Sequence, residues 1–276
     1  MRATGLAAPA KLNLCLYLGP RRKDGLHELR SLFQPLVLAD ELEVSEAGED
    51  EVVCEELARS NLAAQALAAL RRAGWRHPPL RIELRKRIPI AAGLGGGSAD
   101  AAAVLRLASC EVDGLEQIAA ELGADVPSQL EPVPSLVAGA GERVERLGPL
   151  PPLGVLLVPH EEGLSTAEVY REAERLGLPR APSELQELER RLREVATAGS
   201  SPLEHPDLLI NDLQPAAISL RPELDEVIGA LLGSGAAHAA LTGSGPTVFG
   251  LFPGEDGIPD LGEQFPSAIV TSTAES

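Results

Sequence analysis

The stretch that most restricts the fold is residues 89–105, PIAAGLGGGSADAAAVL, where a glycine cluster runs directly into an alanine-rich segment. Four of the five positions in 93–97 are glycine. Glycine loses more conformational freedom on folding than any other residue, so an ordered cluster needs a compensating role. The alanine run favours a helix, and we expect Ser98 to cap it and Asp100 to lie in its first turn. A tight glycine turn at the start of a helix is the predicted local structure.

Such a turn is typical of a phosphate-binding loop. Amide groups without neighbouring Cβ atoms can converge on an anion, and a helix N-terminus adds free N–H groups and a positive dipole end. The chain has no Gly-Lys dipeptide and therefore no Walker A loop. The dinucleotide-binding fingerprint G-x-G-x-x-G matches at Gly93 and Gly95, but its third glycine is replaced by Ser98. These residues therefore predict either a phosphate cradle of another kind or a tight loop without a ligand.

Length and composition place the chain among globular proteins. Its 276 residues suffice for one large domain or two modest ones. Hydrophobic residues make up 44% of it, and no apolar run approaches the roughly 18 residues that would suggest a membrane span. Lys11 and Asn13 interrupt the apolar N-terminal segment, which predicts a first strand there instead of a secretory signal.

Charge and cysteine usage narrow the partners and the compartment. A formal charge of −17 disfavours nucleic acid and anionic membrane surfaces as partners, although a small anion can still bind to a locally positive loop. Cys15, Cys54 and Cys110 are widely separated and have no C-x-x-C spacing. We therefore expect neither a disulfide framework nor a zinc site, and a reducing, cytoplasmic environment.

The periodicity along the chain predicts an α+β protein in two parts. Strict alternation over residues 11–18, KLNLCLYL, predicts a half-buried strand with Lys11 and Asn13 on its second face. Residues 26–44 predict further strand. A helix is expected over 60–73 with Ser60 or Asn61 as its cap, and another over 165–176 with a capping box from Ser165 to Glu168. Further helices are expected over 115–127 and 183–195, a further strand over 155–159, and a glycine turn that runs into an apolar strand within 241–252.

Three stretches together are similar to the three motifs of the GHMP small-molecule kinases: APAKLNL at 8–14, PIAAGLGGGSADAA at 89–102 and LTGSGPTVFGLF at 241–252. Two more, RRKDGLHELRSLFQPL at 21–36 and LGADVP at 122–127, resemble the members that phosphorylate a cytidine-diphosphate sugar alcohol. Any one of the five would be a weak signal, but five in order along the chain are specific.

The resemblance implies a two-domain GHMP kinase fold. An N-terminal domain of the ribosomal-S5-domain-2 type is expected at 1–149 and a ferredoxin-like C-terminal domain at 150–276, divided at the proline- and glycine-rich stretch 148–154. The implied reaction transfers the γ-phosphoryl group of ATP to the 2-hydroxyl of the substrate's methylerythritol part, in the cleft between the domains, as a step of the non-mevalonate isoprenoid route. The alternatives are another GHMP enzyme, such as a homoserine or mevalonate kinase, and a nucleotide-binding protein of this fold that has lost catalysis.

The resemblance also implies a catalytic pair. Asp125 takes the position of the general base that accepts the hydroxyl proton. Lys11 would lie beside it, hold it ionised and offer positive charge to the transferring phosphoryl group. From the residues alone, a turn aspartate and a surface lysine are the alternatives. Mg²⁺ is expected with ATP, held mostly by phosphates and water, with Ser98 as a candidate protein ligand.

The implied binding residues fall into two sets. The ATP-binding set is the glycine loop: Pro89, Ile90, Ala91, Ala92, Gly93, Leu94, Gly95, Gly96, Gly97, Ser98 and Ala99. The substrate-binding set is Asn13, Leu26, His27, Tyr170, Gly243, Ser244 and Gly245. Valine in place of Gly95 or Gly96 is expected to abolish ATP binding and to leave the fold largely intact.

Two places depart from the family's pattern. Leu26 stands where the family usually has tyrosine, and Ser128 and Gln129 follow GADVP, where apolar or aromatic residues are common. We therefore expect a one-sided stack of the cytosine on Tyr170, with Leu26 adding an apolar contact and His27 reading the base edge mainly through its backbone. A core position for Tyr170 on its helix is the alternative. A monomer and a homodimer both remain open.

Overall fold

The computed structural model describes residues 4–57, 61–160 and 162–274 of the chain. The described residues form two compact units that interleave along the sequence. Unit 1 comprises those of Met1–Ala10, Leu38–Ile90 and Gly95–Pro132, and unit 2 those of Lys11–Val37, Ala91–Leu94 and Val133–Ser276. Two long strands, β1 (Thr4–Arg21) and β2 (His27–Glu46), pair with each other and contribute residues to both units. The domain boundary expected at residues 149/150 stays a prediction.

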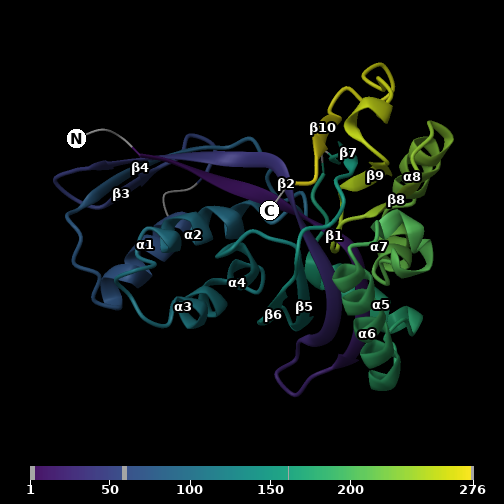
Figure 1. Ribbon diagram of the computed structural model, residues 1–276, viewed down its shortest axis with the longest axis horizontal. Helices are drawn as coiled ribbons and strands as arrows, with labels where there is room; N and C mark the ends of the chain where they lie inside the picture. Colours follow the sequence, from purple (N-terminus) through teal and green to yellow (C-terminus); the bar gives the residue numbers. More distant parts are fainter. Residues whose placement is uncertain (1–3, 58–60, 161, 275–276) are drawn as a thin grey trace. The chain divides into compact units, whose positions relative to one another are not determined.

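Unit 1 is a small sheet with helices on one of its faces (Figure 1). Its strands lie in the order β3-β4-β2, with β3 parallel to β4 and β4 antiparallel to β2. The elements that unit 1 adds to β1 and β2 are β3 (Glu51–Val53), α1 (Leu62–Arg72), β4 (Leu80–Arg85), α2 (Gly96–Arg106), α3 (Leu115–Leu122) and α4 (Val126–Gln129). One apolar cluster joins the sheet to α1 and α2, and the alanines of α2 allow close packing.

The start of α1 agrees with the sequence-based expectation. The Asn61 side chain accepts a hydrogen bond from Ala64 N at 3.0 Å, which satisfies one of the free N–H groups of the first turn. Ser60, the other cap expected, lies outside the described residues. At the far end, Gly74 follows the helix with a φ of +93°, a conformation that glycine adopts without strain.

Unit 2 contains a four-stranded antiparallel sheet in the order β10-β7-β9-β8. Its strands are β7 (Gly154–Val158), β8 (His238–Leu241), β9 (Val248–Phe252) and β10 (Ile269–Ser272). An apolar cluster packs this sheet against α5 (Thr166–Leu176), α7 (Gln214–Leu220) and α8 (Glu223–Gly233). The first part of β2 pairs with β5 (Ser135–Gly139), which pairs with β6 (Arg143–Arg146). The expected α+β class is confirmed.

Two expectations about local structure are wrong. The strand at 11–18 is buried on both faces, because unit 2 covers the side that carries Lys11 and Asn13 as well as the leucine side. The capping box expected at the start of α5 is absent: Ser165 is the N-cap residue, but its side chain makes no capping hydrogen bond. Its hydroxyl therefore contributes less to the helix start than the sequence pattern suggests.

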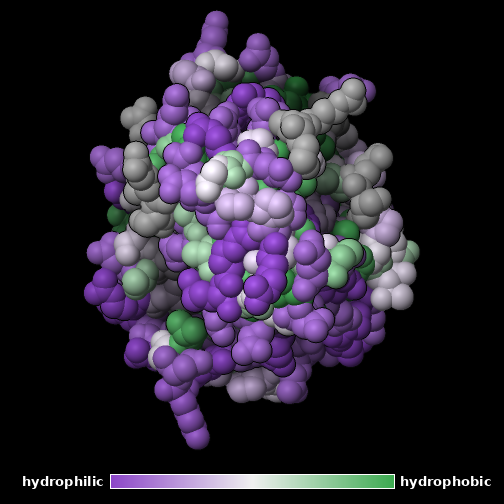
Figure 2. Space-filling view, turned by 90° about the vertical axis from the view of Figure 1, so that its left-hand side faces the viewer, coloured by the Kyte–Doolittle hydropathy of each residue, from purple (hydrophilic) through white to green (hydrophobic). Residues whose placement is uncertain are grey.

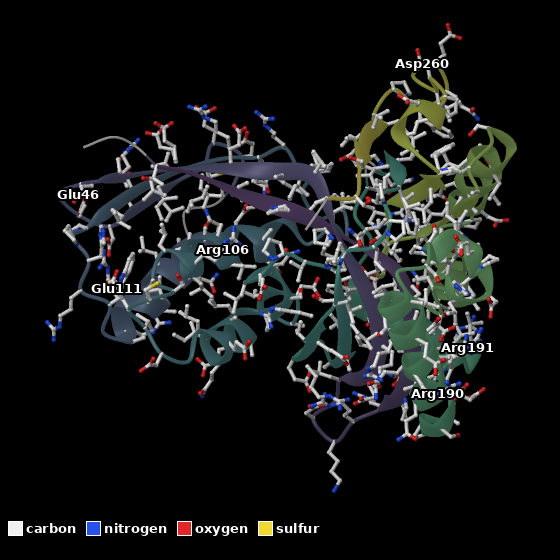
Figure 3. The ribbon with its side chains drawn as sticks, viewed as in Figure 1. Glu46, Arg106, Glu111, Arg190, Arg191 and Asp260 are labelled. Atoms are coloured by element: carbon white, nitrogen blue, oxygen red, sulfur yellow. The ribbon has the colours of Figure 1, made fainter. Side chains whose placement is uncertain are left out.

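Charged side chains dominate the exposed helix α6 (Pro182–Ala198). Arg190 pairs with Glu187 and Glu194 on the same helix, while Arg191 pairs with Asp207. Figure 3 labels both arginines. On the face that Figure 2 shows, hydrophilic residues predominate and apolar residues are scattered. Within the described part of the chain, no helix combines the length and the apolar character needed to cross a membrane.

Candidate active site

The glycine loop reaches α2 through a series of left-handed residues. Ala91, Gly93 and Gly95 have φ values of 57°, 76° and 70°. Gly95 is the N-cap of α2, and the helix begins at Gly96. The expected cap at Ser98 is therefore wrong, because the helix starts two residues before it, and Asp100 lies beyond the first turn. The N–H groups at this helix start are the ones that an anion can use.

Close packing accounts for two of the glycines. A Cβ atom on Gly93 would lie 3.0 Å from the carbonyl oxygens of Thr242 and Gly245. A Cβ atom on Gly96 would lie 3.0 Å from Ile88 Cγ2 and 3.3 Å from Lys86 Nζ. The expectation that valine at Gly95 or Gly96 would spare the fold is therefore wrong: Gly95 has a left-handed backbone, and Gly96 has no room for a branched side chain.

Lys86, Asp40 and Asp100 form a buried ion cluster beside Gly96. Lys86 Nζ donates to Oδ2 of Asp100 at 2.7 Å and also to Oδ2 of Asp40. Oδ1 of Asp40 accepts from the backbone N–H groups of Arg87 and Ile88 at 2.6 and 2.9 Å. Burial raises the pKa of Asp100 to about 7, although Lys86 acts in the opposite direction. The cluster therefore joins β2, the segment after β4 and α2 at the base of the glycine loop.

Lys11 and Asn13 of β1 meet the Gly-Ser-Gly turn inside unit 2. Lys11 Nζ donates to Oδ1 of Asn13 at 2.5 Å and lies 4.6 Å from the ring centroid of Phe33. The backbone N–H of Asn13 donates to Thr242 Oγ1 at 3.1 Å. A Cβ atom on Gly243 would lie 3.3 Å from Asn13 Oδ1 and 3.9 Å from Lys11 Nζ. The structure thus brings together Lys11, Asn13 and Gly243 from the expected set.

Asn211 holds the turn in place. Its side-chain N–H groups donate to the carbonyl oxygens of Leu241 and Gly243, both at 2.8 Å. Ser244 Oγ and Thr166 Oγ1, at the start of α5, lie within hydrogen-bonding distance at 2.9 Å. Side chains on both sides therefore hold the Gly243–Gly245 turn in place. A turn that binds a ligand through its backbone groups needs such support.

Asp125 lies at the start of the short helix α4 in unit 1. It is the N-cap residue, but its carboxylate makes no capping hydrogen bond. Its backbone oxygen accepts from Ser128 Oγ at 2.8 Å, while the Gln129 carbonyl accepts from Arg106 Nη1 at 2.8 Å. Ser128 and Gln129 are both buried, so they pack where the family pattern has apolar residues. Lys11 belongs to unit 2, and the proposed pairing of Lys11 with Asp125 stays a prediction.

His27 and Tyr170 lie together in unit 2. Their ring centroids are 5.4 Å apart, with the planes tilted by 45°. Both ring nitrogens of His27 have protein partners, since Nδ1 lies 3.0 Å from Gly19 O and Nε2 lies 3.0 Å from Glu174 Oε1. Because both ring nitrogens are engaged, only the backbone N–H and C=O groups of His27 remain to bind the edge of a cytosine base. Leu26 is 55% exposed, while Tyr170 packs partly against the apolar cluster of unit 2.

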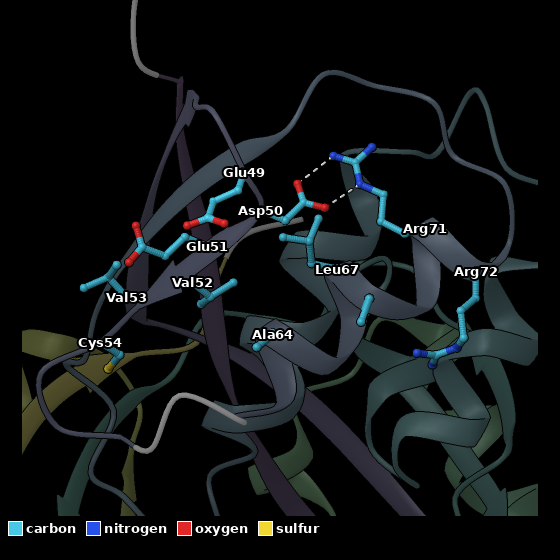
Figure 4. Close-up of a pocket in the computed structure, with 11 residues that line it drawn as sticks. Glu49, Asp50, Glu51, Val52, Val53, Cys54, Ala64, Leu67, Arg71 and Arg72 are labelled. Atoms are coloured by element: carbon cyan, nitrogen blue, oxygen red, sulfur yellow. Dashed lines mark hydrogen bonds and ion pairs between the residues drawn. The ribbon is translucent and has the colours of Figure 1, made fainter.

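A cavity of about 850 Å³ opens in unit 1 between the segment that includes β3 and helix α1 (Figure 4). Its lining residues are Glu49, Asp50, Glu51, Val52, Val53, Cys54, Ala64, Leu67, Ala68, Arg71 and Arg72. None of the expected site residues lines it. Asp50 and Arg71 form two hydrogen bonds with each other, at 2.7 and 2.8 Å. Because no residue of the expected set lines this cavity, we do not take it as the candidate site.

Sequence reasoning missed several residues that shape the site: Ser31, Lys86, Glu174, Asn211 and Thr242. Three of them carried a usable signal. Thr242 lies inside the LTGSG motif, Ser31 lies inside the motif at 21–36, and Lys86 is one of three lysines in the chain. The others are single polar residues whose partners lie far away in the sequence, and periodicity gives no indication of such contacts.

Comparisons with known proteins agree on one family. The models for the GHMP kinases N terminal domain and the GHMP kinases C terminal match residues 61–131 and 183–269. The chain is 42% identical over 264 residues to the 4-diphosphocytidyl-2-C-methyl-D-erythritol kinase of Anaeromyxobacter dehalogenans (strain 2CP-C). This match covers 90% of this chain and 80% of the relative. It is 41% identical over 257 residues to the kinase of the same name from Pelotomaculum thermopropionicum, covering 88% and 87%.

Solved structures give the same result. A crystal structure of 4-(cytidine 5'-diphospho)-2C-methyl-D-erythritol kinase matches with a TM-score of 0.82 and 35% identity, over 99% of this chain and 100% of that one. The homoserine kinase of Cytophaga hutchinsonii, at 18% identity and a TM-score of 0.72 over 100% and 95%, shares the fold. This chain therefore belongs to the 4-diphosphocytidyl-2-C-methyl-D-erythritol kinase family of the GHMP kinases.

Proposed function

We propose that the chain transfers the γ-phosphoryl group of ATP to the 2-hydroxyl of 4-diphosphocytidyl-2-C-methyl-D-erythritol, in the non-mevalonate isoprenoid route. The observation that supports this most directly is the buried cluster in unit 2. Lys11 is 5% exposed and its ammonium is held by Asn13 beside the Gly243 backbone. A lysine is costly to bury, and a fixed positive charge beside a backbone turn suits a transferring phosphoryl group.

The proposed mechanism uses few groups. Asp125 accepts the hydroxyl proton as the oxygen attacks the γ-phosphorus, and Lys11 stabilises the negative charge on the phosphoryl oxygens. The N–H groups at the start of α2 bind the other phosphates. Little covalent help is needed, because phosphoryl transfer depends mainly on positioning and charge. The cytosine would lie against Tyr170 and Leu26, with the backbone of His27 at its edge.

Mg²⁺ accompanies ATP in this proposal. Within the described residues, no group of three His, Cys, Asp or Glu side chains could hold a metal ion. The acidic residues beside the loop, Asp40 and Asp100, are ion-paired with Lys86. The protein would therefore contribute at most the Ser98 hydroxyl, and phosphates and water would supply the other ligands. The three cysteines are free thiols, which suits a reducing compartment, and we place the enzyme in the cytoplasm.

A coupled ADP-release assay on a panel of alcohols tests the proposal. We expect turnover with 4-diphosphocytidyl-2-C-methyl-D-erythritol and none above background with homoserine or mevalonate. Turnover with either of these two instead would assign the chain to another GHMP activity. ATP binding by calorimetry without turnover on any alcohol would indicate a non-catalytic nucleotide-binding protein.

A further inference from the structure

Ser31 contacts Asn13, the residue whose side chain accepts a hydrogen bond from the proposed catalytic lysine. It is a fully buried residue of β2, opposite Val137 of β5. Its hydroxyl donates to Cys15 O at 2.5 Å and accepts from Asn13 Nδ2 at 2.9 Å. A hydroxyl has one hydrogen and two lone pairs. With the hydrogen directed at Cys15 O, the oxygen is left as an acceptor for Asn13.

The Asn13 amide is directional. Its Oδ1 atom accepts from Lys11 Nζ, and its Nδ2 atom donates to Ser31. An ammonium has only donors, so the amide must present oxygen to Lys11. Rotation of the amide by 180° would exchange oxygen and nitrogen with almost no change in shape, and would place an N–H group against the ammonium.

We propose that Ser31 is a positioning residue that fixes the direction of the Asn13 amide, so that its carbonyl holds the Lys11 ammonium in place. The proposal depends on the role proposed above for Lys11. Thr242 supports the same orientation from the other side, since its hydroxyl lies 3.3 Å from Asn13 Oδ1 as a donor. Thr242 cannot enforce that orientation alone, because a hydroxyl can also accept from an N–H group. The carbonyl of Cys15, which only accepts, holds Ser31 as an acceptor and so adds to the preference that the Lys11 ammonium itself imposes on the amide.

Replacement of the serine tests this with a matched control. In Ser31→Ala the Asn13 amide loses its acceptor, and we expect kcat to fall by about tenfold or more with both KM values within about twofold. Ser135→Ala is the control, because Ser135 is also fully buried, lies on the neighbouring strand β5 and donates to Val133 O without contacting Asn13. The control should keep the parent kcat. Equal values for the two variants would overturn the proposal.

A double-mutant cycle separates orientation from packing. In Asn13→Asp the two side-chain oxygens are equivalent and only accept, so Ser31 can only donate to the carboxylate, and rotation of the group changes nothing that Lys11 contacts. Ser31→Ala should therefore lower kcat by less than about twofold in the Asn13→Asp background. The same loss in both backgrounds would assign Ser31 a purely structural role and overturn the proposal.

A readout without turnover keeps the test independent of the proposed function. The ¹⁵N signal of the Lys11 ε-ammonium should be sharp in the parent and in Ser135→Ala, and broadened or shifted in Ser31→Ala. In the Asn13→Asp background, Ser31→Ala should leave the signal unchanged. If the parent has no kinase activity, the proposed function fails while this measurement still decides the positioning role. A Lys11 signal unaffected by Ser31→Ala would overturn it.

Discussion

The Nζ atom of Lys86 lies 2.7 Å from Oδ2 of Asp100, and the two side chains are 6% and 2% exposed. Asp40, whose side chain is fully buried, accepts a second hydrogen bond from the same ammonium. Removal of the lysine would leave two carboxylates together in a buried site, and breaking a buried ion pair in this way costs about 3–5 kcal/mol. We expect Lys86→Met to lower the free energy of unfolding by that amount, as measured by urea denaturation.

The control for this prediction is Lys23→Met, because Lys23 is exposed. A surface substitution of this kind should change the free energy of unfolding by no more than about 0.5 kcal/mol. A loss below about 1 kcal/mol in Lys86→Met would show that the cluster contributes little to the stability of the fold.

We expect His238, at the start of β8, to make the free energy of unfolding depend on pH. Its Nε2 atom is buried without a hydrogen-bond partner among the described residues, and burial lowers its pKa to about 4. The unfolded chain binds the proton at about pH 6.5. Between these values the unfolded state holds more protons, so the free energy of unfolding falls as the pH decreases from about 6.5 to about 4.

Urea titrations of the parent and His238→Gln across this pH range check the prediction. The variant cannot take up the proton, so it should lose less stability than the parent as the pH falls. Above about pH 7 histidine is neutral in both states, and the two proteins should keep a constant difference. Parallel curves down to about pH 4.5 would contradict the prediction.

The local parts of the fold could be predicted from the sequence, whereas the contacts between distant segments could not. Asn61, one of the two cap candidates that the sequence offers, caps α1, because a cap depends on residues within one turn. Ser98 does not cap α2, because the left-handed Gly95 is the N-cap residue and the helix begins at Gly96. The Lys86 cluster joins residues 40, 86 and 100, and no periodic pattern indicates such a contact.

Gly97 offers a cleaner probe of the glycine loop than Gly95 or Gly96. A Cβ atom on Gly97 would meet only Leu62 Cδ1, at 3.4 Å, which is an ordinary contact. Gly97→Ala should therefore leave the fold intact and stabilise α2 by about 0.5–1 kcal/mol. If the loop binds the phosphates through its backbone, the added methyl group should raise the Kd for ATP by about tenfold or more, measured by calorimetry.

The matched control is Gly229→Ala inside α8, where a Cβ atom would meet nothing within 4 Å. This variant should gain comparable helix stability and keep its ATP affinity. An unchanged Kd in Gly97→Ala would show that the phosphates do not approach this turn of α2.

Asp125→Asn tests the general base. The amide cannot accept the hydroxyl proton, so kcat should fall by about 100-fold or more while the Kd for ATP changes little. Asp113→Asn is the control, since Asp113 is an exposed aspartate in the same unit. Turnover of purified Asp125→Asn close to that of the control would remove Asp125 from this role.

The motifs indicate residues of the candidate site more readily than they indicate the contacts that orient those residues. Lys11, Asn13 and Gly243 come together as the motifs suggested. Ser31 was missed because a buried serine in a strand looks like any other core position until its two partners are known. Orientation of an amide depends on a network in three dimensions, and a sequence pattern does not contain it.

The last prediction is that the cytosine of the substrate stacks on the ring of Tyr170. Stacking of a base on an aromatic ring is worth about 1–3 kcal/mol, so Tyr170→Ala should raise the KM for the cytidine substrate by about tenfold and leave the KM for ATP unchanged. Tyr170→Phe keeps the ring and should keep both values. Leu26 is 55% exposed beside His27, and Leu26→Tyr should lower the substrate KM by offering a second aromatic face.

Because Tyr170 also packs partly against the apolar cluster of unit 2, loss of packing must be separated from loss of stacking. Leu178→Ala is the matched control, since Leu178 packs against the same cluster. If Tyr170 acts through stacking, Leu178→Ala should lower the unfolding temperature to a similar extent without raising the substrate KM. If both variants raise the two KM values equally, Tyr170 is a core residue of α5, and the one-sided stack is wrong.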